Sequence, residues 1–215
     1  NVNKIYLDAY EQKSFGSGEK YPDVNLAVTK AFEQGTLVFN YIGHGGPSGM
    51  AHERVVTRDE IRSWDNYDRL ALMVTATCEL SRFDDPSIDS PGELMLFNQN
   101  GGAIALVTTM RLVYISLNRQ ISARIWDDNI VKINGGVQFW GETFINSKNR
   151  SSQAVNLRNF SLLGDPAMKL AIPDYKVVTT QITNASNDSI TLDTLKAFSR
   201  VKISGEIQKP DGTFD

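Results

Sequence analysis

The amino-acid sequence predicts an α/β fold in which a parallel sheet is flanked by helices. Three apolar runs, at residues 37–42, 70–76 and 103–108, have the length and apolar density of strands buried on both faces of such a sheet. Polar segments with helix-start signals separate these runs, so the predicted order is strand, helix, strand, helix, strand. This alternation is typical of parallel strands joined by right-handed helical crossovers.

The helices between the strands have recognisable beginnings. Residues 57–60 and 90–93 have the sequence of capping boxes, in which a hydroxyl and a glutamate satisfy the first free N–H groups of a helix. Asp23 is predicted to cap an earlier helix that runs to about Phe32. Helical spacing of apolar residues predicts two later helices, at residues 117–130 and 137–145.

Three segments around the first helix and the first buried strand are predicted from their composition. Residues 4–9 form a short strand candidate, whereas the polar, glycine-containing residues 11–20 are predicted to be a loop. Residues 45–56 are predicted to be the loop that follows the first buried strand.

The composition changes near Pro173, where threonine, valine, isoleucine, asparagine and aspartate become frequent. Short strands are predicted at residues 177–182, 189–192 and 200–207, with turns at 184–188 and 210–212. We therefore predict one domain over residues 1–172 and a second over 173–215. The second resembles the start of an immunoglobulin-like β-sandwich, but it is too short for the usual seven strands.

The overall composition excludes some classes of function. The net charge of −3 and the lack of a run of lysines or arginines argue against a nucleic-acid-binding surface. No segment approaches the roughly 18 apolar residues of a membrane span. The chain has one cysteine, so it contains no internal disulfide.

That cysteine and one of the two histidines follow the ends of predicted strands. Cys78 comes after the run at 70–76, and His44 comes after the run at 37–42. Because ligands bind at the carboxyl ends of strands in open α/β sheets, the two residues are candidates for one site. A cysteine nucleophile acts as a thiolate that an imidazole can activate. The alternative is that Cys78 is a small buried apolar residue, as lone cysteines often are.

The surroundings of His44 favour it over His52 as the catalytic base. His44 is flanked by glycines, whereas His52 lies in a polar segment with no strand before it. Glycines let a substrate approach and leave backbone N–H groups accessible. We predict that the N–H groups of Gly45 and Cys78 form an oxyanion hole.

The segment after the third strand is a candidate for substrate binding. Met110, Arg111 and Tyr114 follow the carboxyl end of that strand, so they are predicted to line a substrate pocket. Packing at the entry to the next helix explains the same residues equally well.

Several motifs together resemble the gingipain-type cysteine peptidases, which belong to the caspase-like clan with legumain and clostripain. They are Gly-His-Gly-Gly at 43–46, Thr-Cys-Glu at 77–79, Asn-Gln-Asn-Gly-Gly-Ala-Ile-Ala at 98–105 and Leu-Leu-Gly-Asp-Pro at 162–166. The resemblance implies a caspase-like sheet, with Cys78 as nucleophile and His44 as base. It also implies a further part of the catalytic domain upstream of the histidine strand, which we expect this sequence to lack.

Within this family the details are most similar to the sortases of the type IX secretion system. That similarity implies a bacterial cell-surface enzyme associated with the outer membrane and with secretion components there. Such an enzyme cleaves the C-terminal sorting domain from secreted proteins, and it can transfer the product to an amine of anionic lipopolysaccharide. An inactive gingipain-like binding module in a secretion or surface complex is the alternative.

No cofactor and no metal site are predicted. Asp84, Asp85 and Asp89 are possible calcium ligands, and some gingipain relatives bind calcium. Their spacing fits no EF-hand loop, however, so a solvated turn is the preferred interpretation.

Overall fold

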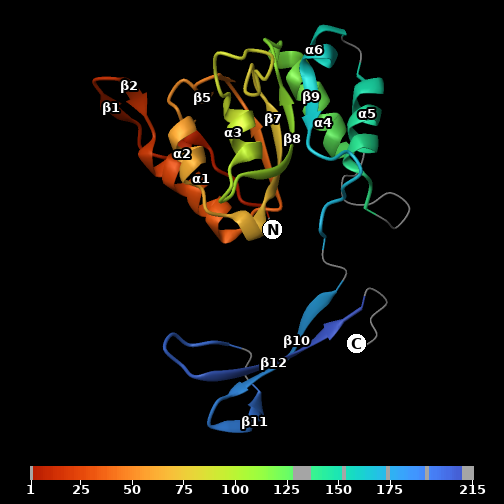
Figure 1. Cartoon of the computed structure of the whole chain (residues 1–215). Coiled ribbons are helices and arrows are strands. Elements are labelled where there is room, and N and C mark those ends of the chain that lie inside the picture. The colour runs from red at the N-terminus through yellow and green to blue at the C-terminus, as the bar shows by residue number, and fades with distance from the viewer. Residues whose placement is uncertain (1, 128–136, 152–153, 173–174, 192–193, 210–215) are drawn as a thin grey trace. The chain divides into compact units, whose positions relative to one another are not determined.

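The computed structural model describes residues 2–127, 137–151, 154–172, 175–191 and 194–209. The chain divides into two compact units, Asn1–Leu170 and Ala171–Asp215. Each unit has its own sheet (Figure 1).

The first unit is built on a four-stranded sheet with the order β3-β7-β8-β9. Strands β3 (Val38–Ile42), β7 (Ala71–Ala76) and β8 (Ala103–Thr109) are parallel, which confirms the three predicted strands. The predicted burial on both faces holds for β7 and most of β8, but it is wrong for β3, an edge strand whose residues are all partly or largely exposed. Strand β9 (Phe160–Leu163) pairs antiparallel with β8, so the sheet is mixed rather than wholly parallel. The prediction missed β9 because it is short and directly follows a helix.

Helices cover both faces of this sheet, which explains why its central strand is buried along its whole length (Figure 1). On β7, Met73 belongs to the core beneath α1, α2 and α3, whereas Leu72 contacts the side of α4 and α5. Side chains of a strand alternate between the two faces of the sheet, so these two adjacent residues pack against the helices on opposite faces. The helices are α1 (Pro22–Gln34), α2 (Arg58–Ser63), α3 (Pro91–Phe97), α4 (Ile115–Asp127), α5 (Trp140–Asn149) and α6 (Ala154–Asn159).

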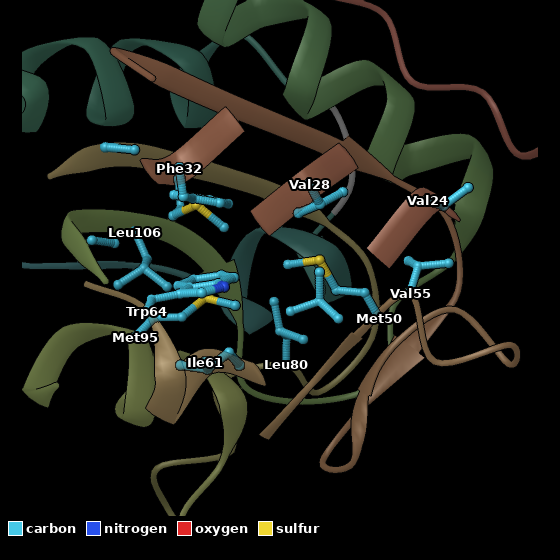
Figure 2. Close-up of a cluster of buried hydrophobic side chains, with 14 residues drawn as sticks. Val24, Val28, Phe32, Met50, Val55, Ile61, Trp64, Leu80, Met95 and Leu106 are labelled. Carbon is cyan, nitrogen blue, oxygen red and sulfur yellow. The ribbon is translucent and has the colours of Figure 1, made fainter. Parts of the chain in front are cut away.

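Aromatic stacking organises the core on the α1–α3 side. Phe32 of α1 lies with its ring centroid 4.1 Å from that of Trp64, and both side chains are almost fully buried. Met95 and Leu106 complete this cluster between the helices and the sheet (Figure 2). Burial of aromatic rings of this size contributes strongly to stability.

The predicted helix starts at Thr57 and Ser90 are confirmed, because both residues form capping boxes with the glutamate three positions later. The predicted cap at Asp23 is wrong. Helix α1 begins at Pro22, whose fixed backbone angle suits the first helical position, and Asp23 lies in the first turn.

Three predictions near the N-terminus are corrected. Residues 7–9 form a 3-10 helix (Leu7–Ala9) rather than part of a strand. The predicted loop at 11–20 contains a hairpin of β1 (Lys13–Phe15) and β2 (Gly18–Lys20). The predicted loop at 45–56 contains two strands of a small antiparallel sheet, β4 (Gly45–Gly46) and β5 (Gly49–Met50), and its third strand, β6 (Val56–Thr57), begins at its end.

The second unit contains an antiparallel sheet with the order β11-β10-β12. Its strands are β10 (Lys176–Asn184), β11 (Asn187–Thr191) and β12 (Val201–Gln208), close to the three predicted ones. The predicted turn at 210–212 lies outside the described residues, and the likeness to an immunoglobulin domain stays a prediction. Of the helices in the described part of the chain, none has the length and apolar character to cross a membrane.

Candidate active site

The register of β3 and β7 brings His44 and Cys78 to the same edge of the sheet. Ile42 pairs with Ala76, so each candidate residue lies two positions beyond a member of the same pair. The Gly43 N–H donates to the Ala76 carbonyl at 3.4 Å, which continues the pairing one residue past β3. Since neighbouring strands lie about 4.8 Å apart, this register brings the histidine and the cysteine to adjacent strand ends.

Gly45 contacts Thr77, the residue before the cysteine. A β-carbon on Gly45 would lie 2.5 Å from Thr77 Oγ1, closer than any real side chain tolerates. Thr77 is fully buried, so it has little room to move away. A glycine at position 45 therefore allows the histidine loop to approach the end of the cysteine strand closely.

The backbone around His44 is held by two hydrogen bonds to its carbonyl oxygen. The Tyr41 phenol donates one at 2.6 Å, and the Ala51 N–H donates the other at 2.7 Å. A β-carbon on Gly43 would lie 2.6 Å from the phenol oxygen, so glycine is needed there for Tyr41 to reach His44. Burial raises the pKa of Tyr41 to about 12, so the phenol stays protonated as a donor even at alkaline pH.

The small sheet leaves the N–H of Gly45 unpaired with β5. Gly45 is opposite Met50, and the neighbouring pair His44 and Ala51 is hydrogen-bonded. Opposed residues in an antiparallel ladder alternate between bonded and non-bonded pairs, so Gly45 and Met50 form a non-bonded pair. The Gly45 N–H consequently points away from β5 and is available to a ligand.

His52 also belongs to this site, which the sequence did not reveal. Its ring centroid lies 4.8 Å from that of His44, and both imidazoles are exposed. The β4–β5 pairing reverses the chain and brings residue 52 back beside residue 44. In the sequence, this hairpin was indicated by the two residues between Gly46 and Gly49, which have the spacing of a tight turn.

The Cys78 side chain is partly exposed at the end of β7. Its sulfur lies 3.5 Å from the Val113 carbonyl, to which the thiol donates a weak hydrogen bond. The chain turns sharply at the next residue, because Glu79 has a positive φ of 48°. Such a backbone angle is uncommon outside glycine, and residues of this kind cluster at active sites.

The loop after Cys78 is held together by ion pairs. Arg82 lies 3.6 Å from Glu79 and 3.4 Å from Asp85, while Arg111 lies 2.6 Å from Asp84. These two aspartates, considered above as calcium ligands, are thus engaged by arginines. Among the described residues, no group of three or more potential ligands has a metal-binding arrangement.

The predicted substrate-binding segment lies directly beside the cysteine. Tyr114 is 67% exposed, and its backbone exchanges hydrogen bonds of 3.0 and 3.1 Å with the Asn156 side chain of α6. The Met110 N–H donates to the Asn159 carbonyl of the same helix at 3.0 Å. Arg111 is half exposed and paired with Asp84, so the segment presents a fixed backbone and an accessible surface next to Cys78.

A cysteine and a histidine at adjacent strand ends of a helix-flanked α/β sheet fit the class of caspase-like cysteine peptidases. The model of a known family, described as Peptidase family C25, matches residues 1–171. The chain therefore belongs to peptidase family C25, the gingipain family. No curated protein matches the chain significantly.

Two solved structures with this fold come from gingipains. The Arg-specific cysteine proteinase gingipain R (RgpB) matches with a TM-score of 0.61 and 13% identity over 86% of this chain and 50% of its own. The complex of the pro- and mature domains of Porphyromonas gingivalis RgpB matches with a TM-score of 0.60 and 12% identity, covering 86% of this chain and 51% of its own. The chain thus spans about half the length of these structures, and at such identities the likeness concerns the fold.

Proposed function

We propose that this chain carries the catalytic cysteine and histidine of an endopeptidase. The observation that carries the proposal is the shared register of His44 and Cys78, two positions past the paired residues Ile42 and Ala76. Membership of a peptidase family supports the same roles. In this proposal, the Cys78 thiolate attacks the scissile carbonyl, and His44 receives the thiol proton and delivers it to the leaving amine.

The tetrahedral intermediate requires donors for its negative oxygen. The Gly45 N–H, which β5 leaves unpaired, and the Cys78 N–H are proposed to supply them. Collapse of the intermediate breaks the C–N bond and leaves a thioester on Cys78. Met110, Arg111 and Tyr114, which belong to the segment whose Val113 carbonyl accepts from the Cys78 thiol, are proposed to contact the substrate on its way to that site.

The motifs of the sequence further favour a sortase of the type IX secretion system, of the PorU type. In this role the enzyme removes the C-terminal sorting domain from cargo proteins at the bacterial cell surface. The thioester is then resolved by water or by an amine of anionic lipopolysaccharide. Outer-membrane secretion components are its proposed partners.

The test is the fate of cargo in cells whose protein carries Cys78→Ala. We expect mass spectrometry to find cargo that retains its sorting domain and lacks attached glycolipid. A Cys78→Ala protein that is present at the normal level and still processes cargo would contradict the proposal.

A further inference from the structure

A solvent-open groove of about 670 Å³ lies on the surface beside the histidine loop. Lys20 of the β1–β2 hairpin forms one wall, and the start of α2 forms another; both elements lie on the same side of the sheet (Figure 1). The groove is lined by Lys20, Pro47, Ser48, Arg54, Thr57, Arg58, Asp59, Arg62 and Ile88, and is called the basic groove below.

The basic groove contains an excess of positive charge. Four of its residues are cationic and one is acidic, although the chain as a whole has a net charge of −3. Asp59 pairs with Arg62 at 3.0 Å, which neutralises one of the cations. Lys20, Arg54 and Arg58 have no carboxylate within 4.0 Å among the residues that the structure describes.

Two other acidic residues close in sequence to the groove residues, Glu60 and Glu19, form hydrogen bonds elsewhere. Glu60 accepts hydrogen bonds from the Thr57 cap and, at 2.6 Å, from the side chain of Asn25. Glu19 accepts from the Ser14 hydroxyl at 2.7 Å. Neither carboxylate is therefore directed at the cations of the groove.

The backbone of Arg54 is held in position, and Arg58 has an unsatisfied donor. Arg54 has a left-handed backbone with φ of 57°, and its carbonyl accepts a hydrogen bond of 2.9 Å from Asn25 of α1. The Nε of Arg58 is buried and has no hydrogen-bond partner in the described part of the chain. A buried donor without a partner is costly, and an anionic ligand would satisfy it.

The groove is continuous in sequence with the candidate active site. Pro47 and Ser48, which line it, form the turn between β4 and β5, immediately after Gly45 and Gly46. The turn that lines the groove is thus part of the same loop that carries His44. Guanidinium groups match the geometry of carboxylates, and an open groove accepts an extended chain.

We propose that the basic groove binds an acidic segment of the polypeptide substrate, outside the scissile bond itself. That the bound segment belongs to a substrate rests on the peptidase function proposed above. Carboxylate side chains of that segment would pair with Lys20, Arg54 and Arg58. The groove thus favours substrates with several aspartates or glutamates close to the cleavage site.

The test measures binding in a chain with Cys78→Ala, so that its outcome does not depend on cleavage. Fluorescence anisotropy would follow a labelled peptide of eight aspartates and glutamates, with the matching asparagine and glutamine peptide as control. We expect the acidic peptide alone to bind, and to bind more weakly as salt screens the charges. The double variant Arg54→Gln/Arg58→Gln should weaken binding about tenfold.

Matched variants separate the groove from general charge effects. Arg119→Gln removes an exposed charge on α4, outside the groove, and should leave the affinity unchanged. Lys20→Gln changes only the hairpin and provides a second test should the arginine variants lose their fold. Equal affinity in the groove variants, or no binding of the acidic peptide, would overturn the proposal. Binding of inorganic polyphosphate without binding of the peptide would also overturn it and indicate a phosphate-bearing ligand.

Discussion

The phenol of Tyr41 donates a hydrogen bond of 2.6 Å to the carbonyl of His44 and so ties the end of β3 to the residue proposed as base. The bond forms across Gly43, where any side chain would collide with the phenol. Tyr41 and the glycine at position 43 therefore help to fix the backbone of the histidine, while its imidazole stays exposed at the strand end.

Tyr41 gives this arrangement a measurable pH dependence. Its pKa is raised by burial to about 12, whereas the phenol of an unfolded chain titrates near 10. Because the folded state binds the proton more tightly, this contribution is complete below pH 10 and is lost as the pH rises toward 12. The wild-type protein should lose up to about 2 kcal/mol of stability over this pH range through the Tyr41 phenol, and we expect Tyr41→Phe to lack this loss. Denaturant unfolding of both proteins between pH 9 and 12 measures the difference; identical pH profiles would contradict the assignment.

Because the two histidines lie close together, mutation of each is needed to show which one acts as the base. His44→Ala should lower cargo processing by at least about a hundredfold, the usual contribution of a general base. His52→Ala should leave it largely intact, although the rings lie 4.8 Å apart, because only His44 is in register with Cys78. Processing in cells, normalised to protein level, is the measurement. An inactive but folded His52 variant would contradict the assignment of His44 as the base.

The buried hydroxyl of Thr77 leads to a prediction about stability. Thr77 Oγ1 has no hydrogen-bond partner in the described structure, so Thr77→Val should be neutral or stabilise by up to about 1 kcal/mol. Thr109 is the matched control, because its hydroxyl donates to the Thr77 carbonyl. Thr109→Val should destabilise by about 1–2 kcal/mol. Thermal unfolding distinguishes the two, and equal losses in both variants would show that Thr77 has a partner.

The Gly-Asp-Pro sequence after β9 is predicted to be structural. Asp165 accepts a hydrogen bond of 2.9 Å from the Ala167 N–H and so closes the turn. Asp165→Ala should lower stability by about 1 kcal/mol without changing turnover per folded molecule. Gly164→Ala should be more harmful, since Gly164 has φ of 118° and its β-carbon would lie 2.7 Å from that of Ala105. An Asp165 variant with normal stability and no activity would indicate a catalytic role instead.

The centre of the sheet was predictable from the sequence because β7 and β8 are buried on both faces. Residues 70–76 are apolar at almost every position, and β7 is buried at every residue. Local chemistry likewise predicted the helix starts at Thr57 and Ser90. Strand β9 escaped prediction because four residues after a helix give little periodicity.

The site was predictable in part, since a residue two positions past a buried strand lies at the sheet edge whatever surrounds it. The proximity of His52 was not predictable in the same way, because it depends on a hairpin of two-residue strands. The basic groove was equally hidden. Lys20 and Arg58 are far apart in the sequence, and only tertiary packing brings them to one surface.

The most direct test of the central claim, that His44 activates Cys78, is the rate at which iodoacetamide alkylates Cys78 at neutral pH. Peptide mass spectrometry would follow the modification in the wild-type chain, in His44→Ala and in His52→Ala. An imidazole beside the thiol increases the reactive thiolate fraction, so His44→Ala should slow alkylation about tenfold while His52→Ala stays close to wild type. Alkylation at the wild-type rate in His44→Ala, with the fold intact, would contradict the account.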